Sequence, residues 1–440
     1  MKIQRPATFS KKTLRLPGSK SESNRALIIQ ALSSEEISIE NLSNADDTNI
    51  IRQAVQSKDM IIDCEHSGAA LRFLCAYFSI QPHREIILTG SQRLKERPLK
   101  ILVDALKELG AHIEYLEKTG YAPIKIKGKE LISHAPITIQ ADVSSQFISS
   151  LLMIAPRIKN GLQLHLENKI ISAPYLNMTM NMMHQAKVHI ILNDESIIVP
   201  EQEYESCSYY IEPDWSAASY WYAFVSLGIE ELFLEGFKKE STQGDSILAQ
   251  WMSDWNVETV FEEHGIRLIR TDNFSPKAQY DFTDCPDIAQ TLITLSALKK
   301  HPLKFTGIES LRVKETDRME ALQNELGKIG VELERGHLGT SASLSNHSAQ
   351  GPSESTTDLN EHYILDFKNN VNRPFGSAQG PIDTYNDHRM AMAFSLLSMC
   401  FDDVDIKDEQ VVSKSYPNFW VDLGSMGFLL SIGYRESGIG

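Results

Sequence analysis

One pattern recurs along this chain and constrains its fold more than any other feature. It consists of an amphipathic helix of about ten residues, a small or polar residue, and a short alternating strand. The clearest copies cover residues 102–115, 178–190, 248–261 and 321–333. Their strands begin at Ala111, Val188, Val257 and Val331. These starts lie about 70 to 77 residues apart, and such a period indicates duplication of one supersecondary unit.

A second helix type, almost wholly apolar and rich in small residues, recurs in the same units. We count six such helices, and they begin at Ser21, Ser67, Ser144, Asp214, Pro286 and Asn386. A helix that is apolar on every face is buried, and Ser, Asp and Asn are residues that cap free N-terminal amides. Six buried helices predict an α/β protein with two domains of three units each.

The length of 440 residues also favours two domains, because a single hydrophobic core rarely serves more than about 250 to 300 residues. The repeat is interrupted near residues 212–214, and a strand expected at 13–16 precedes the first buried helix. We therefore predict a first domain over residues 20–213 and a second domain over residues 1–19 and 214–440.

Two stretches depart from the repeat. The first unit is short and has room for one brief strand at residues 60–63 in place of a hairpin. Residues 337–383 are rich in Ser, Asn, Gly and Pro and contain the string SAQGP twice. This composition predicts a surface insertion that holds a strand near residues 363–367.

The composition argues against several classes of partner. A net charge of −15 opposes binding to nucleic acid and to anionic membrane surfaces. No apolar run reaches the roughly 18 residues of a membrane span, and the first residues lack the apolar core of a signal peptide. The five cysteines are scattered and never in CxxC spacing, which favours neither a disulfide framework nor a zinc site. We expect a cytoplasmic monomer without a metal or a cofactor.

Charged residues cluster near the predicted helix ends. A helix N-terminus offers unpaired amides and about half a positive charge, so several converging ends form an anion site. The basic residues at these ends are Lys20, Arg25, Arg97, Arg318, Arg389 and Lys414. In an acidic protein they predict a locally positive pocket for anionic ligands. Asp287 and Glu315 lie among them as candidate proton-transfer groups, and His388 adds a group that titrates near neutrality.

Six strings along the chain resemble the 5-enolpyruvylshikimate-3-phosphate synthase family, and they occur in that family's order. They are LPGSKSESNRAL (16–27), KERPL (95–99), DVSSQF (142–147), RVKETDR (312–318), TYNDHRMAM (384–392) and KSYPNFW (414–420). The resemblance implies two inside-out α/β domains, each of three βαβαββ units, that close over the substrates. It implies transfer of the enolpyruvyl group of phosphoenolpyruvate to the 5-hydroxyl of 3-phosphoshikimate, in the shikimate pathway of aromatic amino acid biosynthesis.

The resemblance also implies roles for particular residues. Contacts to 3-phosphoshikimate are implied for Lys20, Ser21, Arg25, Ser144, Ser145, Gln146, Ser172, Asp287, Ser310 and Lys314. Contacts to phosphoenolpyruvate are implied for Lys20, Gly68, Arg97, Gln146, Arg318, Arg389 and Lys414. The catalytic set is Asp287, Glu315, Lys20, Lys414 and His388. In the expected addition and elimination, Asp287 accepts the hydroxyl proton and Glu315 exchanges protons with C3 of phosphoenolpyruvate, while Lys20 and Lys414 stabilise the leaving phosphate.

The sequence departs from the family pattern beside the expected phosphoenolpyruvate pocket. His66 stands where an Asn is usual, Ser67 replaces an Ala, and Ala69 replaces a common Thr. Ser310 replaces an Asn near the expected shikimate phosphate. Two alternatives stay open: the related transferase that acts on UDP-N-acetylglucosamine, whose usual reactive lid cysteine is missing from residues 88–97, and a homologue that binds anions without catalysis.

Overall fold

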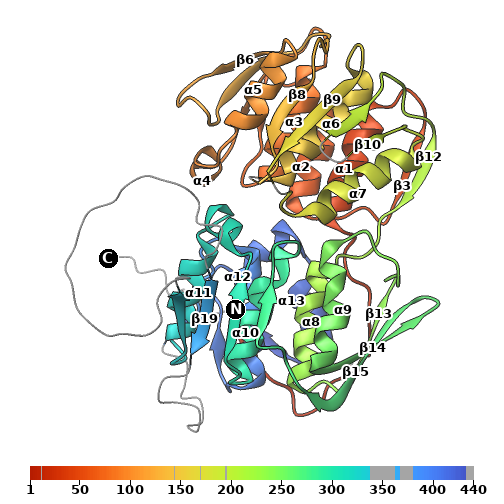
Figure 1. Ribbon diagram of the computed structural model, residues 1–440. Coiled ribbons are helices and arrows are strands. Elements are labelled where there is room, and N and C mark those ends of the chain that lie inside the picture. Colours follow the sequence, from red (N-terminus) through yellow and green to blue (C-terminus); the bar gives the residue numbers. More distant parts are fainter. Residues whose placement is uncertain are drawn as a thin grey trace.

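The computed structural model describes residues 1–10, 12–142, 144–168, 170–193, 196–336, 362–366 and 380–432. Within these ranges the chain forms two lobes, one above the other in Figure 1. The first lobe has a core drawn from residues 26–211, and the second has a core drawn from Ile3, Leu14, Leu16 and residues 215–428. The chain therefore has two cores, and the domain bounds given above stay a prediction.

Four sheets share one topology, in which the first strand is parallel to the second and the third and fourth form an antiparallel hairpin beside it. In the first lobe they are β4 (Ile61–Asp63), β5 (Glu85–Thr89), β6 (His112–Tyr115) and β7 (Ile124–Lys127), then β8 (Ile137–Gln140), β9 (Leu162–Glu167), β10 (Ile191–Asn193) and β11 (Ser196–Val199). In the second lobe they are β2 (Thr13–Leu14), β13 (Glu231–Glu235), β14 (Trp255–Glu262) and β15 (Gly265–Phe274), then β16 (Gln279–Asp281), β17 (Leu303–Thr306), β18 (Glu332–Gly336) and β19 (His362–Asp366). This shared strand order confirms that one unit is duplicated, as the sequence predicts.

Two smaller sheets complete the lobes. In the first lobe, β3 (Ile37–Glu40) pairs in parallel with β12 (Cys207–Tyr210). In the second lobe, β1 (Lys2–Gln4) lies between β20 (Val404–Asp405) and β21 (Leu429–Ser431). The β3 unit has no hairpin of its own within the described ranges, because the brief strand predicted at 60–63 is β4, which belongs to the next sheet.

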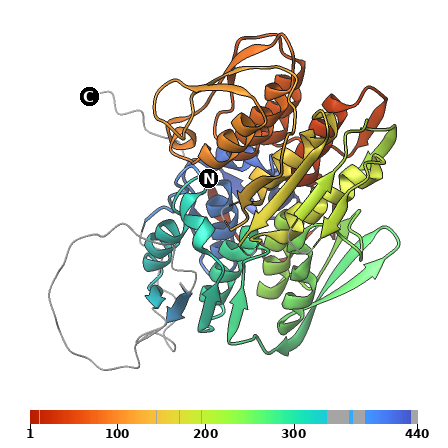
Figure 2. The same cartoon turned by 45° about the horizontal axis from the view of Figure 1, so that its top comes forward.

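Six buried helices fill the two cores, as the apolar repeats predict. They are α1 (Lys20–Leu32), α3 (Gly68–Ser79), α6 (Ser145–Ile154), α8 (Trp215–Leu227), α10 (Ala289–Leu298) and α12 (His388–Ser395). The remaining α-helices are α2 (Asp46–Gln56), α4 (Gln92–Lys95), α5 (Lys100–Glu108), α7 (Ala173–Gln185), α9 (Leu248–Trp251), α11 (Arg318–Gly327) and α13 (Phe419–Ser425). Figures 1 and 2 show helices side by side within each lobe, with strands toward the outside. Within the described ranges, none of these helices has both the length and the apolar character that crossing a membrane requires.

The predicted strand and helix boundaries hold to within a few residues. Strands β6, β10, β14 and β18 begin within about three residues of the predicted starts. Ser67, Ser144 and Asp214 cap their helices as predicted. The first helix is capped by Ser19 and begins before Ser21, and the last is capped by Asp387 because Asn386 has a left-handed φ of 56°. Pro286 opens a 3-10 turn that leads into α10.

Only part of the predicted insertion at 337–383 can be compared with the structure. The strand expected near 363–367 is β19, which pairs antiparallel with both β17 and β18. Both copies of SAQGP lie wholly or mostly outside the described residues.

The chain passes between the lobes twice, and the two passages lie side by side. Gly18 forms a β-bridge with Pro213. The Ser19 amide donates to the Glu212 carbonyl at 2.8 Å, and the Asp214 amide donates to the Pro17 carbonyl at 2.9 Å. We call residues 17–20 and 211–214 the crossing segments. Because they are hydrogen-bonded to each other, the lobes are joined at one paired strip of backbone.

Candidate active site

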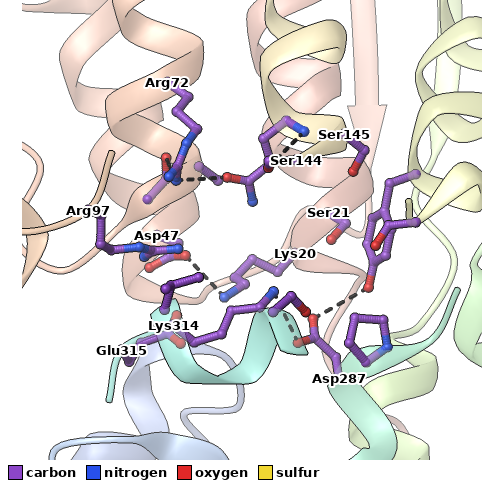
Figure 3. Close-up of a pocket in the computed structure, with 18 of the residues that line it drawn as sticks. Lys20, Ser21, Asp47, Arg72, Arg97, Ser144, Ser145, Asp287, Lys314 and Glu315 are labelled. Carbon is purple, nitrogen blue, oxygen red and sulfur yellow. Dashed lines mark hydrogen bonds and ion pairs between the residues drawn. The ribbon is translucent and has the colours of Figure 1, made fainter. Parts of the chain in front are cut away.

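A cavity of about 140 Å³ lies between the two lobes. Residues of the first lobe line one side, including Lys20, Ser21, Arg25, Gly68, Arg97, Ser144, Ser145, Gln146 and Ser172. Residues of the second lobe line the other side, including Asp287, Ser310, Lys314, Glu315, Arg318, His388 and Arg389. Every residue predicted for the site is therefore on this wall except Lys414. Figure 3 shows the labelled side chains pointing toward one another across the gap.

Five helix N-termini supply the cavity with backbone amides and a favourable dipole. Helices α1, α3, α6, α11 and α12 each begin at a residue of the wall. The hydroxyl of Ser67 accepts from the Ala70 amide at 3.0 Å, and the carboxylate of Asp387 accepts from the Arg389 amide at 2.8 Å. These caps use only part of the free amides at each helix start, so the remaining amides suit an anion.

Arg318 holds three carboxylates on the second lobe. Its side chain is 1% exposed, and it contacts Asp387 at 2.7 Å, Glu315 at 2.8 Å and Asp287 at 3.2 Å. Asp287 also pairs with Arg389 at 2.9 Å, and the Lys314 ammonium lies 3.8 Å from it. The two predicted proton-transfer groups therefore share one buried cation.

These cations govern how the two acids ionise. Burial by itself raises the pKa of Asp287, but Arg389, Lys314 and Arg318 outweigh burial and hold that pKa below its usual value. Burial likewise raises the pKa of Glu315, and Arg318 and Arg97 bring it well below the usual value. Both carboxyl groups are therefore ionised at neutral pH in the ligand-free pocket.

His388 is a neutral group in this setting. Burial lowers its pKa most, and the positive charges of Lys20 and Arg389 lower it further. Both ring nitrogens are buried without a hydrogen-bond partner among the described residues. A neutral imidazole facing the cavity can donate one hydrogen bond and accept another.

Lys20 projects from the first turn of α1 and is paired with an acid that the sequence reasoning missed. Its ammonium lies 3.0 Å from Asp47, the second residue of α2 (Figure 3). Burial lowers the pKa of Lys20, but Asp47 and Glu315 raise it above the usual value. Lys20 therefore stays charged. Nothing in the string around Asp47 distinguishes it from an ordinary acid in the first turn of a helix.

Two arginines lie against Gly68 on the first lobe. Arg72, which was not predicted, donates to the Gln146 side chain at 3.0 Å and to the Gly68 carbonyl at 3.1 Å. Arg97 is 8% exposed, and its Nε and Nη1 have no hydrogen-bond partner among the described residues. A Cβ at Gly68 would lie 2.4 Å from Arg97 and 2.6 Å from Arg72, so only glycine lets both guanidinium groups approach. Arg72 is the one charged residue in the apolar string SGAALRFLCAYF, and that isolated charge could have identified it as a site residue.

The part of the cavity beside α7 is richer in hydroxyl groups. Ser144 and Ser145 lie at the start of α6, and Ser172 lies just before α7 with a left-handed φ of 58°. Arg25 donates to Thr179 at 2.6 Å and to the Tyr175 carbonyl at 3.1 Å, and burial lowers its pKa to about 10. The Tyr175 hydroxyl, also unpredicted, donates to Asp287 at 3.4 Å.

Lys414 is not among the residues that line the cavity. Its ammonium donates to the Asn386 carbonyl at 2.5 Å. Burial lowers its pKa, although Asp387, Glu315 and Asp47 oppose that effect. The ammonium group carries three donors, so Lys414 can keep this hydrogen bond and still contact an anion.

Comparison with known proteins gives one consistent result. Residues 5–57 and 50–423 match the family described as EPSP synthase (3-phosphoshikimate 1-carboxyvinyltransferase). The chain is 42% identical over 431 residues to the 3-phosphoshikimate 1-carboxyvinyltransferase of Bacteroides fragilis strain YCH46, covering 96% of this chain and 97% of that protein. It is 33% identical to the protein of the same name from Colwellia psychrerythraea, covering 93% and 96%.

Solved structures agree on the fold. EPSP synthase from Acinetobacter baumannii is similar with a TM-score of 0.72 at 17% identity, covering 98% of this chain and 99% of that chain. An enolpyruvyl transferase from Streptomyces tendae is similar with a TM-score of 0.65 at 13% identity, covering 97% of each chain. The fold is the two-domain α/β fold that the six strings implied. On its matched sequence and on these relatives, the chain belongs to the EPSP synthase (3-phosphoshikimate 1-carboxyvinyltransferase) family.

Proposed function

We propose that the protein transfers the enolpyruvyl group of phosphoenolpyruvate to the 5-hydroxyl of 3-phosphoshikimate and releases phosphate. The observation that carries this proposal is the cavity between the lobes, where Asp287 and Glu315 lie among cations from both sides. Family membership and the shared name of the relatives support the same reaction. Two anionic substrates fit this charge distribution because each brings the counter-charge that the cations lack.

We assign phosphoenolpyruvate to the side of the cavity that holds the arginines. Arg97 has free donors there, and the start of α3 at Gly68 offers backbone amides to a phosphate. Arg318 and Arg389 face this region from the second lobe. Gln146 and Lys20 also line the cavity, and we assign each of them contacts to both substrates.

We assign 3-phosphoshikimate to the side that holds the hydroxyl groups. The polar groups of this side are Ser21, Arg25, Ser144, Ser145, Ser172, Ser310 and Lys314. Hydroxyl groups and α6 amides suit a phosphate ester, while Lys314 and Asp287 suit the ring hydroxyls. Asp287 then lies beside the hydroxyl that must lose its proton.

The ionised Asp287 acts as the base that accepts the proton of the 5-hydroxyl as this oxygen attacks C2 of phosphoenolpyruvate. Glu315 delivers a proton to C3 and takes one back when the tetrahedral intermediate expels phosphate. Binding of anions among Arg318 and Arg97 cancels the charge that depresses the pKa of Glu315, so this group gains a proton when substrates are present. Neutral His388 assists Glu315 by donating a hydrogen bond in the same part of the cavity.

Lys20 and Lys414 stabilise the phosphate as it leaves. Lys20 is already charged and directed into the cavity (Figure 3). Lys414 donates to the Asn386 carbonyl with one N–H group, and its ammonium group has two further donors for the phosphate.

Phosphate release from phosphoenolpyruvate and 3-phosphoshikimate tests the proposal. We expect turnover by the wild type and a loss of about 10²-fold or more in Glu315→Gln, because general acid and base catalysis contributes about 10²- to 10⁴-fold. Glu320→Gln is the matched control, since Glu320 is an exposed neighbour on α11. A wild type that binds both substrates in calorimetry without turnover would refute the proposal.

The same assay separates the two acceptors. With UDP-N-acetylglucosamine in place of 3-phosphoshikimate, we expect no phosphate release. Release with the nucleotide sugar alone would assign the chain to that reaction instead.

A further inference from the structure

A buried carboxyl group bridges the two lobes outside the cavity. Glu22 is the third residue of α1 and is 7% exposed. One of its oxygens accepts from the backbone amide of Glu212 at 3.0 Å, and the other accepts from the hydroxyl of Thr242 at 3.2 Å. Glu212 belongs to a crossing segment, and Thr242 lies in the second lobe between β13 and the 3-10 turn at Gly244–Ile247. Glu22 thus ties the start of α1 to the second lobe.

A second buried carboxyl group lies beside the first. Glu212 is 4% exposed, and its side chain accepts from Trp215 at 3.0 Å, from the Lys238 amide at 3.0 Å, and from Ser241 and Gln243. Four donors stabilise a negative charge on Glu212, whereas two donors reach Glu22. When the two acids hold one negative charge between them, Glu212 carries it and Glu22 keeps its proton.

The bridge is linked directly to residues of the cavity. Lys20 and Ser21 immediately precede Glu22 in the first turn of α1, and both line the cavity. The Lys20 amide donates to the Asp214 carboxylate at 3.2 Å, which is a second link from this turn to the crossing segments. A shift of the turn relative to the second lobe therefore moves Lys20 and Ser21 relative to Asp287.

We propose that Glu22 is a positioning residue of the transfer reaction, whose carboxyl group fixes the first turn of α1 to Glu212 and Thr242. It sets the distance of Lys20 and Ser21 from the groups of the second lobe. The inference rests on the function proposed above. It adds a residue that touches neither substrate and lies at the joint between the lobes.

The bridge also depends on pH in a defined direction. Burial and the neighbouring Glu212 raise the pKa of Glu22 to about 7. Asp214 on the crossing segment adds to this effect, and Arg25 on α1 is the nearby cation. In the 3-10 turn that follows Thr242, burial and the charge of Asp287 raise the pKa of Asp245 to about 7. Lys238 faces Glu212 from the segment after β13.

The direction in which pH changes stability follows from the pKa of Glu22 in the folded chain and in the unfolded chain. A carboxyl group whose pKa is raised in the folded state binds its proton more tightly there, so stability is lost as pH rises from about 4.5 through about 7. Above pH 7 the joint holds two negative charges, and opening to water relieves their repulsion. We expect 3-phosphoshikimate to bind less tightly above pH 7 for this reason.

Three variants test the inference. Glu22→Gln keeps the shape and an acceptor for the Glu212 amide but never ionises, and Glu22→Ala removes the bridge. Glu205→Gln is the matched control, because Glu205 is exposed on the same lobe. The assay measures kcat and the KM for 3-phosphoshikimate between pH 5.5 and 8.5, with circular dichroism to verify folding.

We expect Glu22→Ala to raise the KM for 3-phosphoshikimate by about tenfold, with a smaller change in kcat, as loss of hydrogen bonds to a buried acid predicts. Glu22→Gln should match the wild type at pH 6 and lack the rise in KM that the wild type shows above pH 7. Glu205→Gln should follow the wild type throughout. If Glu22→Ala is folded with unchanged KM, or Glu22→Gln keeps the wild-type pH profile, the inference is wrong.

A second measurement separates this inference from the proposed function. Denaturant unfolding of the ligand-free wild type and Glu22→Gln needs no turnover. The stability of the wild type should fall relative to Glu22→Gln between pH 5 and pH 8. If the wild type shows no transfer activity yet this difference appears, the reaction is wrong and the buried bridge stands. If the difference is absent, the bridge is wrong whatever the activity.

Discussion

At the scale of single residues, one buried guanidinium organises the chemistry. Arg318 is almost fully buried and faces Asp287, Glu315 and Asp387 together. A buried ion pair gains little net stability because desolvation opposes it, but it fixes geometry when every partner is satisfied. Arg318 therefore serves the site mainly by holding the two proposed proton-transfer groups in place and ionised. Substrate anions must compete with these carboxylates for the cations around them.

Arg97→Ala should weaken phosphoenolpyruvate binding strongly. Loss of a guanidinium from a desolvated anion site costs about 2 to 5 kcal/mol, because the anion is left without its partner. We expect the KM for phosphoenolpyruvate to rise accordingly while the KM for 3-phosphoshikimate changes little. Arg52→Ala is the control, since Arg52 is exposed on α2. An unchanged KM for phosphoenolpyruvate in Arg97→Ala would show that Arg97 does not bind this substrate.

Sequence reasoning located the charged residues that belong to distinctive strings and missed their partners. Glu315 and Arg318 were identified from RVKETDR, and the structure brings them within 2.8 Å. Asp47 was missed because its pairing with Lys20 depends on how α1 and α2 pack, which no local string encodes. Tyr175 was missed for the same reason. Lys414 was predicted to contact phosphoenolpyruvate and to act in catalysis, and this stays a prediction, because Lys414 is not among the residues that line the cavity.

At the scale of elements, the proposed ligand binding depends on the starts of the helices. Each buried helix places its first turn at the cavity or close to it, so the same caps that complete the helices also aim amides at the gap. In helix α11, the cap that completes the helix also positions a residue of the cavity. Its cap, Asp317, accepts from the amides of Met319 at 3.1 Å and Glu320 at 3.1 Å, and Arg318 is its first residue.

Asp317→Ala should lower both stability and activity. Loss of an N-cap side chain costs about 1 kcal/mol and frays the turn that carries Arg318. We expect a lower denaturant midpoint at unchanged m-value, together with a reduced kcat. Asp317→Asn retains an acceptor for both amides and should recover most of the stability. Equal stability of Asp317→Ala and wild type would show that the cap is not needed.

The repeat predicted most elements because its two periodicities are properties of local sequence. Apolar runs identified all six buried helices, and alternation identified β6, β14 and β18 to within about two residues. Cap positions at the first and last buried helices were wrong by one or two residues, since several small polar residues stand together there. The pairing order of strands could not be read from the pattern, because it is set by contacts between distant segments.

At the scale of the whole molecule, the cavity exists only where the lobes meet. Away from the crossing segments, hydrogen bonds join the lobes at several points among the described residues. They include Ser413 to Asp46 at 2.5 Å, Arg93 to the Arg312 carbonyl at 3.2 Å and the Ala173 amide to Asp284 at 3.2 Å. The cations on the two walls repel each other until an anion arrives, so binding of the first substrate should favour closure.

Small-angle scattering should detect this closure. We expect the radius of gyration to fall when 3-phosphoshikimate is added, because the phosphate bridges cations of both lobes. Unphosphorylated shikimate at the same concentration is the control and should have a smaller effect. An identical radius with and without 3-phosphoshikimate would show that the lobes do not move. The forward scattering also reports the mass in solution, which we expect to be that of one chain.

The position of β1 has a consequence for how the protein is made. Its residues, Lys2–Gln4, are synthesised before their partners in β20 and β21, which lie about 400 residues later. The first lobe can complete its core as soon as Ile211 has left the ribosome, and domains generally fold in that order. Strand β1 has no partner strand while the first lobe folds, because β20 and β21 have not yet been made. Strand β1 is thus synthesised long before its partners, and it can take its place in the second lobe only after β20 and β21 have been made.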